Sequence, residues 1–202
     1  MKKPSNPKPY HHGDLRTAVL TAAERILERE GIDALTLRAV ARAVGVSHTA
    51  PKNHFGDLQG LLSELAAVGY RRYGEVLGRA MDAAGTDPRA RMRAMGRAYV
   101  GFARTHPRLF LLMFRSERLD MTRPALSESI ESARQALRIA ATSVAPASPL
   151  KIAARATASW ALVHGFAMLL LDGRLQNTLA SLPDRNDVDV LLEAVLDVTR
   201  TD

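Results

Sequence analysis

One short segment, residues 36–47, constrains the fold more than any other part of the chain. It reads Thr-Leu-Arg-Ala-Val-Ala-Arg-Ala-Val-Gly-Val-Ser. Thr36 can cap a short helix, and Gly45 can adopt the positive φ that ends this helix in a tight turn. Ser47 can then cap a second short helix that runs to about Phe55. Two short helices joined by such a turn have the geometry of a helix-turn-helix.

The rest of the chain is predicted to be helical as well. Apolar residues recur at helical spacing in long stretches, whereas no run alternates in the way a strand does, and no internal repeat is found. Glycine, proline and capping residues separate the stretches. The predicted helices cover about residues 14–30, 57–81, 88–105, 109–114, 124–140, 150–171 and 188–199, with a loop over 173–187. We therefore expect an all-α fold in which the long helix from Asp57 bridges two halves.

Charge and composition narrow the class of protein. The net charge is +7, and a basic protein favours polyanions such as nucleic acid. The chain has no cysteine, which excludes disulfides and thiolate metal sites and fits a cytoplasmic location. No secretory signal is visible. The longest apolar stretch, Trp160–Leu171, is interrupted by His164 and is predicted to be too short to span a membrane.

Enzymatic and metal-binding functions find no support in the motifs. His48 and His54 are not at the i, i+4 spacing of a helical metal pair, and His11-His12 lies in a basic, proline-rich start of the chain. No nucleotide-binding loop, dinucleotide fingerprint or nucleophile motif occurs. We expect no metal site, no cofactor and no enzymatic activity.

Residues 36–62, TLRAVARAVGVSHTAPKNHFGDLQGLL, resemble the signature of the tetracycline-repressor family of transcriptional regulators. The preceding residues EREGIDALTL fit this family too. A second resemblance, Trp160-x-x-x-His164-Gly165, is similar to the C-terminal domain of one subgroup, whose members also tend to begin YHHGDLR and to carry Ala-Pro in the second short helix. These features occur here at residues 10–16 and 50–51.

The resemblance implies a domain organisation. A flexible basic arm over residues 1–13 would precede a three-helix DNA-binding domain over 14–60. The long helix would join this domain to a helical effector-binding and dimerisation domain over 61–202. The dimer face would use residues 150–171 and 188–199 as a four-helix bundle.

The resemblance also implies which residues contact DNA. Asn53 would pair with adenine and Arg38 with guanine or a phosphate, while Ser47 and Lys52 would contact phosphates. The implied DNA-binding residues are Arg38, Ser47, His48, Thr49, Lys52, Asn53 and His54. The sequence departs from the family where Lys52 replaces a usual tyrosine and Leu58 a usual lysine, so one expected phosphate contact is missing.

A set of methionine and aromatic side chains in the second half has two interpretations. It could form solid core, or it could line a cavity for a small, mostly apolar effector, because methionine adapts to irregular ligands. The candidate ligand-binding residues are Met95, Tyr99, Phe102, Phe110, Met113, Trp160 and His164.

These features together predict a homodimeric regulator, most simply a repressor that binds a palindromic double-stranded DNA operator and is released by the effector. Two alternatives remain open from the sequence. One is a protein that binds DNA without sequence specificity, and the other is a helical small-molecule-binding protein with a vestigial helix-turn-helix.

Overall fold

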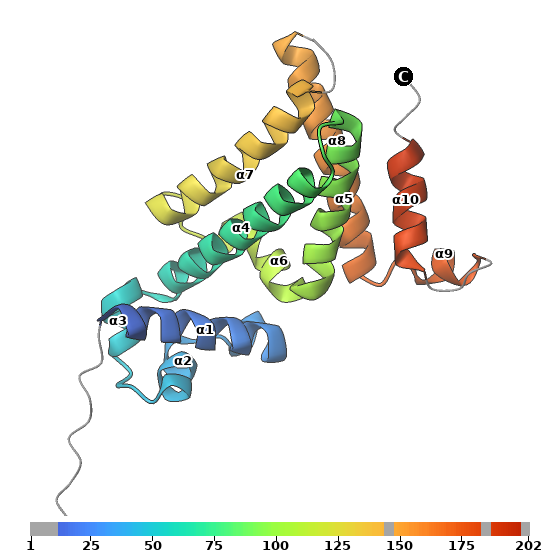
Figure 1. Cartoon of the computed structure of the whole chain (residues 1–202). Helices are drawn as coiled ribbons and strands as arrows, with labels where there is room; N and C mark the ends of the chain where they lie inside the picture. Colours follow the sequence, from blue (N-terminus) through green and yellow to red (C-terminus); the bar gives the residue numbers. More distant parts are fainter. Residues whose placement is uncertain (1–11, 144–147, 183–186, 199–202) are drawn as a thin grey trace, which may run out of the picture.

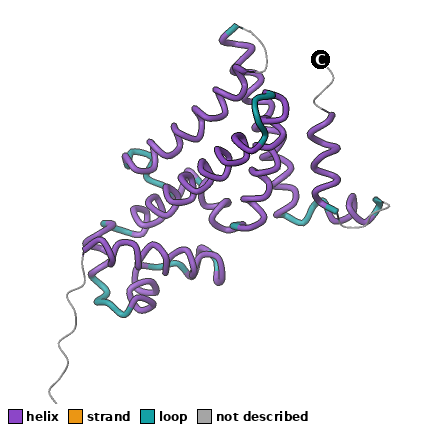
Figure 2. The backbone as a smooth tube through the Cα atoms, in the orientation of Figure 1, coloured by secondary structure: helices purple, strands orange, loops and turns teal. Residues whose placement is uncertain are grey.

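The computed structural model describes residues 12–143, 148–182 and 187–198, and this part of the chain is helical without any strand (Figures 1 and 2). The expected all-α fold is therefore confirmed. The α-helices are α1 (His12–Glu30), α2 (Leu37–Val44), α3 (Ala50–Phe55), α4 (Leu58–Ala83), α5 (Pro88–Thr105), α6 (Pro107–Met113), α7 (Pro124–Ser143), α8 (Pro149–Leu171), α9 (Gln176–Ala180) and α10 (Val188–Val198). Two short 3₁₀ turns, η1 (Ile32–Ala34) and η2 (Ser116–Arg118), lie between them. The predicted arm falls mostly on residues 1–11, which lie outside the described residues.

Capping residues set the helix boundaries largely as predicted. The Thr36 hydroxyl accepts a hydrogen bond from the Ala39 N–H (3.1 Å), and Gly45 ends α2 with a φ of 77°. The Asp57 carboxylate accepts from the Gly60 N–H (2.7 Å) at the start of α4. Each cap satisfies a backbone group that the first or last turn leaves without an intrahelical partner.

The prediction that Ser47 caps the second short helix is wrong. α3 begins at Ala50, so Thr49 and not Ser47 stands at the N-cap position. The Ser47 hydroxyl is hydrogen-bonded to that of Thr49 (3.1 Å). The reason is Pro51. A helix capped by Ser47 would place Pro51 where its missing N–H should bond to the Ser47 carbonyl, and its ring would crowd that carbonyl. Starting at Ala50 leaves Pro51 at the second helical position, where no donor is needed.

Two predictions about the C-terminal part also need correction. The predicted loop over residues 173–187 contains α9, a helix of five residues that is too short to show a periodic pattern. α8 has 23 residues and, by length and composition only, is long and apolar enough to cross a membrane. The prediction that it is too short considered only the stretch after Trp160. One such helix is weak evidence for a membrane span. Within this chain, 22% of the most apolar stretch of α8 is buried.

α4 joins the two parts of the molecule (Figure 1). Its first half packs against α1 and α3, and its length packs against α5, α6 and α7. Nearly every residue from Gly60 to Tyr70 is buried, and the apolar core is continuous from Val19 in α1 to Phe110 in α6. The predicted domain boundary after residue 60 falls inside α4, so movement of the body can reach the N-terminal helices through packed side chains.

α10 lies against α5 through a row of ion pairs. Arg93 is paired with Glu193 (2.6 Å) and also with Asp197. Arg97 also pairs with Glu193, and Arg104 pairs with Asp189 at the other end of α10. The Arg93 and Arg97 side chains hold the pKa of Glu193 below its usual value. The pairs run along the side of α10 that faces α5, while buried Leu192 and Leu196 provide its apolar contact.

Candidate functional site

α3 is anchored by one face and leaves the other to solvent. Pro51 and Phe55, four residues apart, both point into the protein and are buried. The Arg16 guanidinium of α1 lies over the Phe55 ring at 5.3 Å from its centroid. Lys52 and Asn53, between the two anchors, are exposed. This is the geometry needed by a helix that is to enter a groove of DNA.

α2 holds α3 in place through a compact turn. The N–H groups of Gly45 and Val46 both donate to the Ala41 carbonyl at 3.0 Å, which closes the end of α2. Ala41 is buried, and its small side chain lies next to this turn. Val46, which follows Gly45 in this turn, is half-buried.

Most of the residues predicted to bind DNA are exposed. Arg38 lies in the first turn of α2, and the turn before α3 carries Ser47, His48 and Thr49, all exposed. His54 differs, because it is half-buried and its ring lies 6.3 Å from that of Phe55. Residues 36–56 contain three basic side chains, Arg38, Arg42 and Lys52, and no acidic one. The surface is therefore electrostatically suited to phosphates.

The two departures from the signature have different structural roles. Lys52 is exposed and keeps a charge available for a phosphate. Leu58, in the first turn of α4, is half-buried and packs against the core. It therefore contributes apolar contact where a lysine would reach outward.

Comparison with known families identifies the class of protein. Residues 19–65 match the family of bacterial regulatory proteins named tetR, and residues 92–199, more than half of the chain, match the tetracycline-repressor-like C-terminal domain. The chain belongs to the tetracycline-repressor family. It is therefore a helix-turn-helix transcriptional regulator and not an enzyme, as the sequence predicted. Its assignment to the Trp-x-x-x-His-Gly subgroup stays a prediction.

Solved structures agree with this assignment. A protein of unknown function from Rhodococcus sp. RHA1 is 33% identical, with a TM-score of 0.76 over 95% of this chain and 98% of that one. A TetR-like transcriptional regulator from the same organism is 17% identical, with a TM-score of 0.61 over 96% of this chain and 100% of that one. The TetR-family regulator PfmR from Thermus thermophilus is 16% identical, with a TM-score of 0.60 over 88% of this chain and 96% of that one. The last two share the fold. No curated protein matches the chain.

Aromatic residues of this regulator form one cluster inside the body. The Phe110 ring lies 5.5 Å from that of Tyr99 and 5.0 Å from that of Phe114. His164 lies 4.7 Å from Phe114 and 5.6 Å from Trp160, which is 42% exposed. The cluster therefore leads from the core to the surface of α8.

The structure brings most of the candidate ligand-binding residues into or beside this cluster. Met95, Tyr99, Phe102, Phe110 and Met113 are buried in the core, while His164 is half-buried and Trp160 exposed. Tyr73 was missed as a candidate, although its ring lies edge-on to Tyr99 (5.4 Å) and Phe102 (5.7 Å). In the sequence Tyr73 is only one apolar position among many in a long helix, and nothing there shows which rings it meets. Phe114, whose ring lies 5.0 Å from that of Phe110, belongs to the same methionine and aromatic set but is not among the candidate ligand-binding residues.

A cavity of about 450 Å³ lies elsewhere, as an open groove between the end of α4 and the middle of α5. It is lined by Ala80, Ala83, Ala84, Ala94, Arg97 and Ala98, none of which was predicted to bind a ligand. The sequence left open whether the methionine and aromatic set is solid core or lines a cavity. In this conformation its five buried members are packed as core: Met95, Tyr99, Phe102, Phe110 and Met113.

His164 and Tyr99 form a hydrogen bond inside the body. The Tyr99 oxygen lies 2.7 Å from Nδ1 of His164. Burial raises the pKa of Tyr99 and lowers the pKa of His164, so at neutral pH the phenol is protonated and the imidazole neutral. The hydrogen bond therefore joins a neutral phenol and a neutral imidazole.

We expect the regulator to lose stability as the pH falls below about 6.5, the ordinary pKa of histidine. The unfolded chain then takes up a proton at His164 before the folded protein does, and the loss ends below the lowered pKa of the folded state. His164→Gln, whose amide can still hydrogen-bond with Tyr99 but does not titrate, should flatten this part of the stability curve. Urea titrations at pH 5 to 8 measure it. Exposed His48, replaced by glutamine, serves as control and should leave the slope as it is.

Proposed function

We propose that this regulator binds a palindromic operator as a homodimer and releases it when a small, mostly apolar effector binds. The observation that carries the proposal is the geometry of α3, whose inner face is anchored while its outer face is exposed and free of acidic residues. A DNA-binding protein of this kind acts in the cytoplasm. The proposed DNA-binding domain covers residues 14–60, and the rest of the chain senses the effector and forms the dimer.

Contacts within the DNA-binding surface divide into two kinds. Asn53 has the paired donor and acceptor that match adenine in the major groove, and Arg38 can donate two hydrogen bonds to guanine. Lys52 and Ser47 neutralise or hydrogen-bond phosphates, which fixes the register of the helix without reading sequence. His48 and Thr49 lie in the turn that leads into α3 and would meet the edge of the groove.

A second copy of the chain is the proposed cover for an exposed apolar surface. Large apolar side chains lie exposed on α8 and α10: Leu150, Leu169, Val190 and Val198. A surface of this kind on a regulator marks a protein interface. Two copies also provide two recognition helices, which have to lie about 34–36 Å apart, or a multiple of this, to reach successive major grooves.

The proposed effector site is the surface end of the aromatic cluster. Trp160, Phe114 and His164 connect the buried rings of Tyr99 and Phe110 with solvent. An apolar molecule that inserts there has to separate these rings, and His164 offers it one polar group. An effector that binds better to a state with the wrong spacing of recognition helices shifts the dimer toward that state and lowers its affinity for the operator.

Selection of bound fragments from genomic DNA by the purified protein tests this proposal and should return one palindrome. On that palindrome, Asn53→Ala should cost about 1–3 kcal/mol and relax the preference at one base pair. Lys52→Ala should weaken binding to all sequences alike and reduce the salt slope by roughly 0.9. Gel-shift titrations from low to high salt, on the palindrome and on a random duplex, measure both effects.

The matched control is Arg138→Ala, which removes a charge from the exposed Arg138–Glu131 pair on α7, away from α3. It should leave both DNA affinities close to those of the wild type. Equal losses on palindrome and random DNA for Asn53→Ala would contradict its assignment as a base-reading residue. Equal affinity of the wild type for every sequence would favour nonspecific DNA binding instead. Binding of an apolar ligand without any binding of DNA would favour a vestigial helix-turn-helix.

A further inference from the structure

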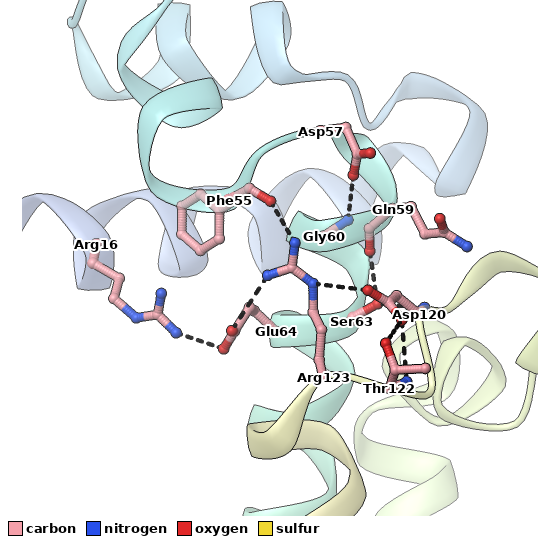
Figure 3. A network of polar contacts seen from close by, with 10 residues as sticks. All are labelled: Arg16, Phe55, Asp57, Gln59, Gly60, Ser63, Glu64, Asp120, Thr122 and Arg123. Carbon is pink, nitrogen blue, oxygen red and sulfur yellow. Dashed lines mark hydrogen bonds and ion pairs between the residues drawn. The ribbon is translucent and has the colours of Figure 1, made fainter.

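Arg123 makes a contact between the body and the C-terminal end of α3 (Figure 3). It lies directly before α7, and its Nη2 donates a hydrogen bond to the Phe55 carbonyl at 2.8 Å. Phe55 is the last residue of α3, where carbonyl groups have no partner within the helix and the helix dipole is negative. A guanidinium at this position satisfies the carbonyl with a charge-assisted hydrogen bond.

Two carboxylates lie within ion-pair distance of the same guanidinium. Its Nη1 lies 3.7 Å from Glu64 of α4, and its Nε lies 3.6 Å from Asp120 in the turn before α7. Glu64 is buried and also pairs with Arg16 of α1 at 2.5 Å. The Arg16 guanidinium in turn lies over the Phe55 ring. The network therefore connects α1, α3 and α4 with the segment that leads into α7.

Backbone geometry makes room for this contact. A Cβ atom at Gly60 would overlap both the Phe55 carbonyl oxygen and the Arg123 guanidinium, so a residue with a side chain there would displace one of them. The turn that carries Arg123 is itself fixed on α4, because the Asp120 N–H donates to the buried Ser63 hydroxyl at 2.8 Å. The Asp120 carboxylate accepts from both the backbone and the hydroxyl of Thr122.

We propose that Arg123 is a positioning residue, which sets the orientation of the recognition helix α3 from the body of the molecule. The inference rests on the proposed reading of an operator by α3. Arg123 belongs to the segment between α6 and α7, so a displacement of that segment reaches the end of α3 through one side chain, in addition to any movement of α4. Arg123 itself does not have to touch DNA.

Arg123→Ala and Arg123→Lys test the proposal, with Arg138→Ala as a control that removes the same charge from an exposed site on α7. Arg123→Ala should lower affinity for the selected palindrome by about tenfold or more, equivalent to ~1.4 kcal/mol, relative to the control. Its affinity for a random duplex should match that of the control. Lysine keeps the charge but lacks the planar fork that serves Phe55 and Glu64 together, so Arg123→Lys should also lose affinity for the palindrome alone.

Amide hydrogen exchange provides a readout that does not depend on DNA. Residues 50–56 should exchange faster in both Arg123 variants, while residues 37–44 of α2 keep the wild-type rate. Equal losses on palindrome and random DNA, or unchanged exchange over residues 50–56 in Arg123→Lys, would overturn the proposal. If the wild type selects no palindrome, the proposed function fails, and the exchange measurement alone decides whether Arg123 holds α3.

Discussion

Replacing Phe110 with alanine is expected to lower the free energy of unfolding by about 3–5 kcal/mol. The Phe110 ring is completely buried and lies between the rings of Tyr99, Phe114 and His164. Tyr99 and His164 are hydrogen-bonded to each other, so they cannot both collapse into the space that alanine leaves. The loss therefore combines the transfer free energy of the ring with the cost of a cavity.

Urea unfolding at one fixed protein concentration measures this loss, because the stability of the proposed dimer depends on concentration. Phe110→Leu is the matched control, since leucine fills most of the volume, and it should cost less than about 1.5 kcal/mol. A loss for Phe110→Ala no larger than that for Phe110→Leu would mean that the ring is not tightly surrounded. That result would favour a cavity at this position over solid core.

The local features of the DNA-binding part could be predicted from the sequence because their causes lie within a few residues. Thr36 caps α2 from three residues away, and Gly45 ends α2 because its own backbone takes a positive φ. The start of α3 was predicted wrongly, although its cause is also local. Ser47 has the chemistry of a cap, but the constraint from Pro51 outweighs it, since a missing donor and a ring clash cost more than a cap contributes.

Features that depend on tertiary packing were beyond the sequence. Arg123 and the Phe55 carbonyl are 68 residues apart, and no spacing rule connects a side chain with a distant backbone oxygen. Tyr73 has the periodicity of a core position, yet only the packing of α4 on α5 shows that it meets Tyr99.

Leu169→Glu is expected to separate the dimer and to lower affinity for the palindrome by about 10²–10⁴-fold. Leu169 is 44% exposed on α8, in the surface that we propose is covered by a second copy. A carboxylate there would have to be buried without a partner in the interface, which is unfavourable by several kcal/mol. A monomer presents a single recognition helix and loses the gain in affinity that comes from linking two half-site contacts.

Light scattering at micromolar concentration should then give a mass near 22.0 kDa for the variant and near twice this value for the wild type. The matched control is Ser132→Glu, which adds the same charge at an exposed position on α7 and should keep both the dimer and the DNA affinity. The two readouts have to change together, because the proposal attributes the loss of affinity to dissociation. A variant that stays dimeric and binds the palindrome as the wild type does would place the interface elsewhere. A wild type that is monomeric would leave the exposed apolar face of α8 and α10 to some other partner.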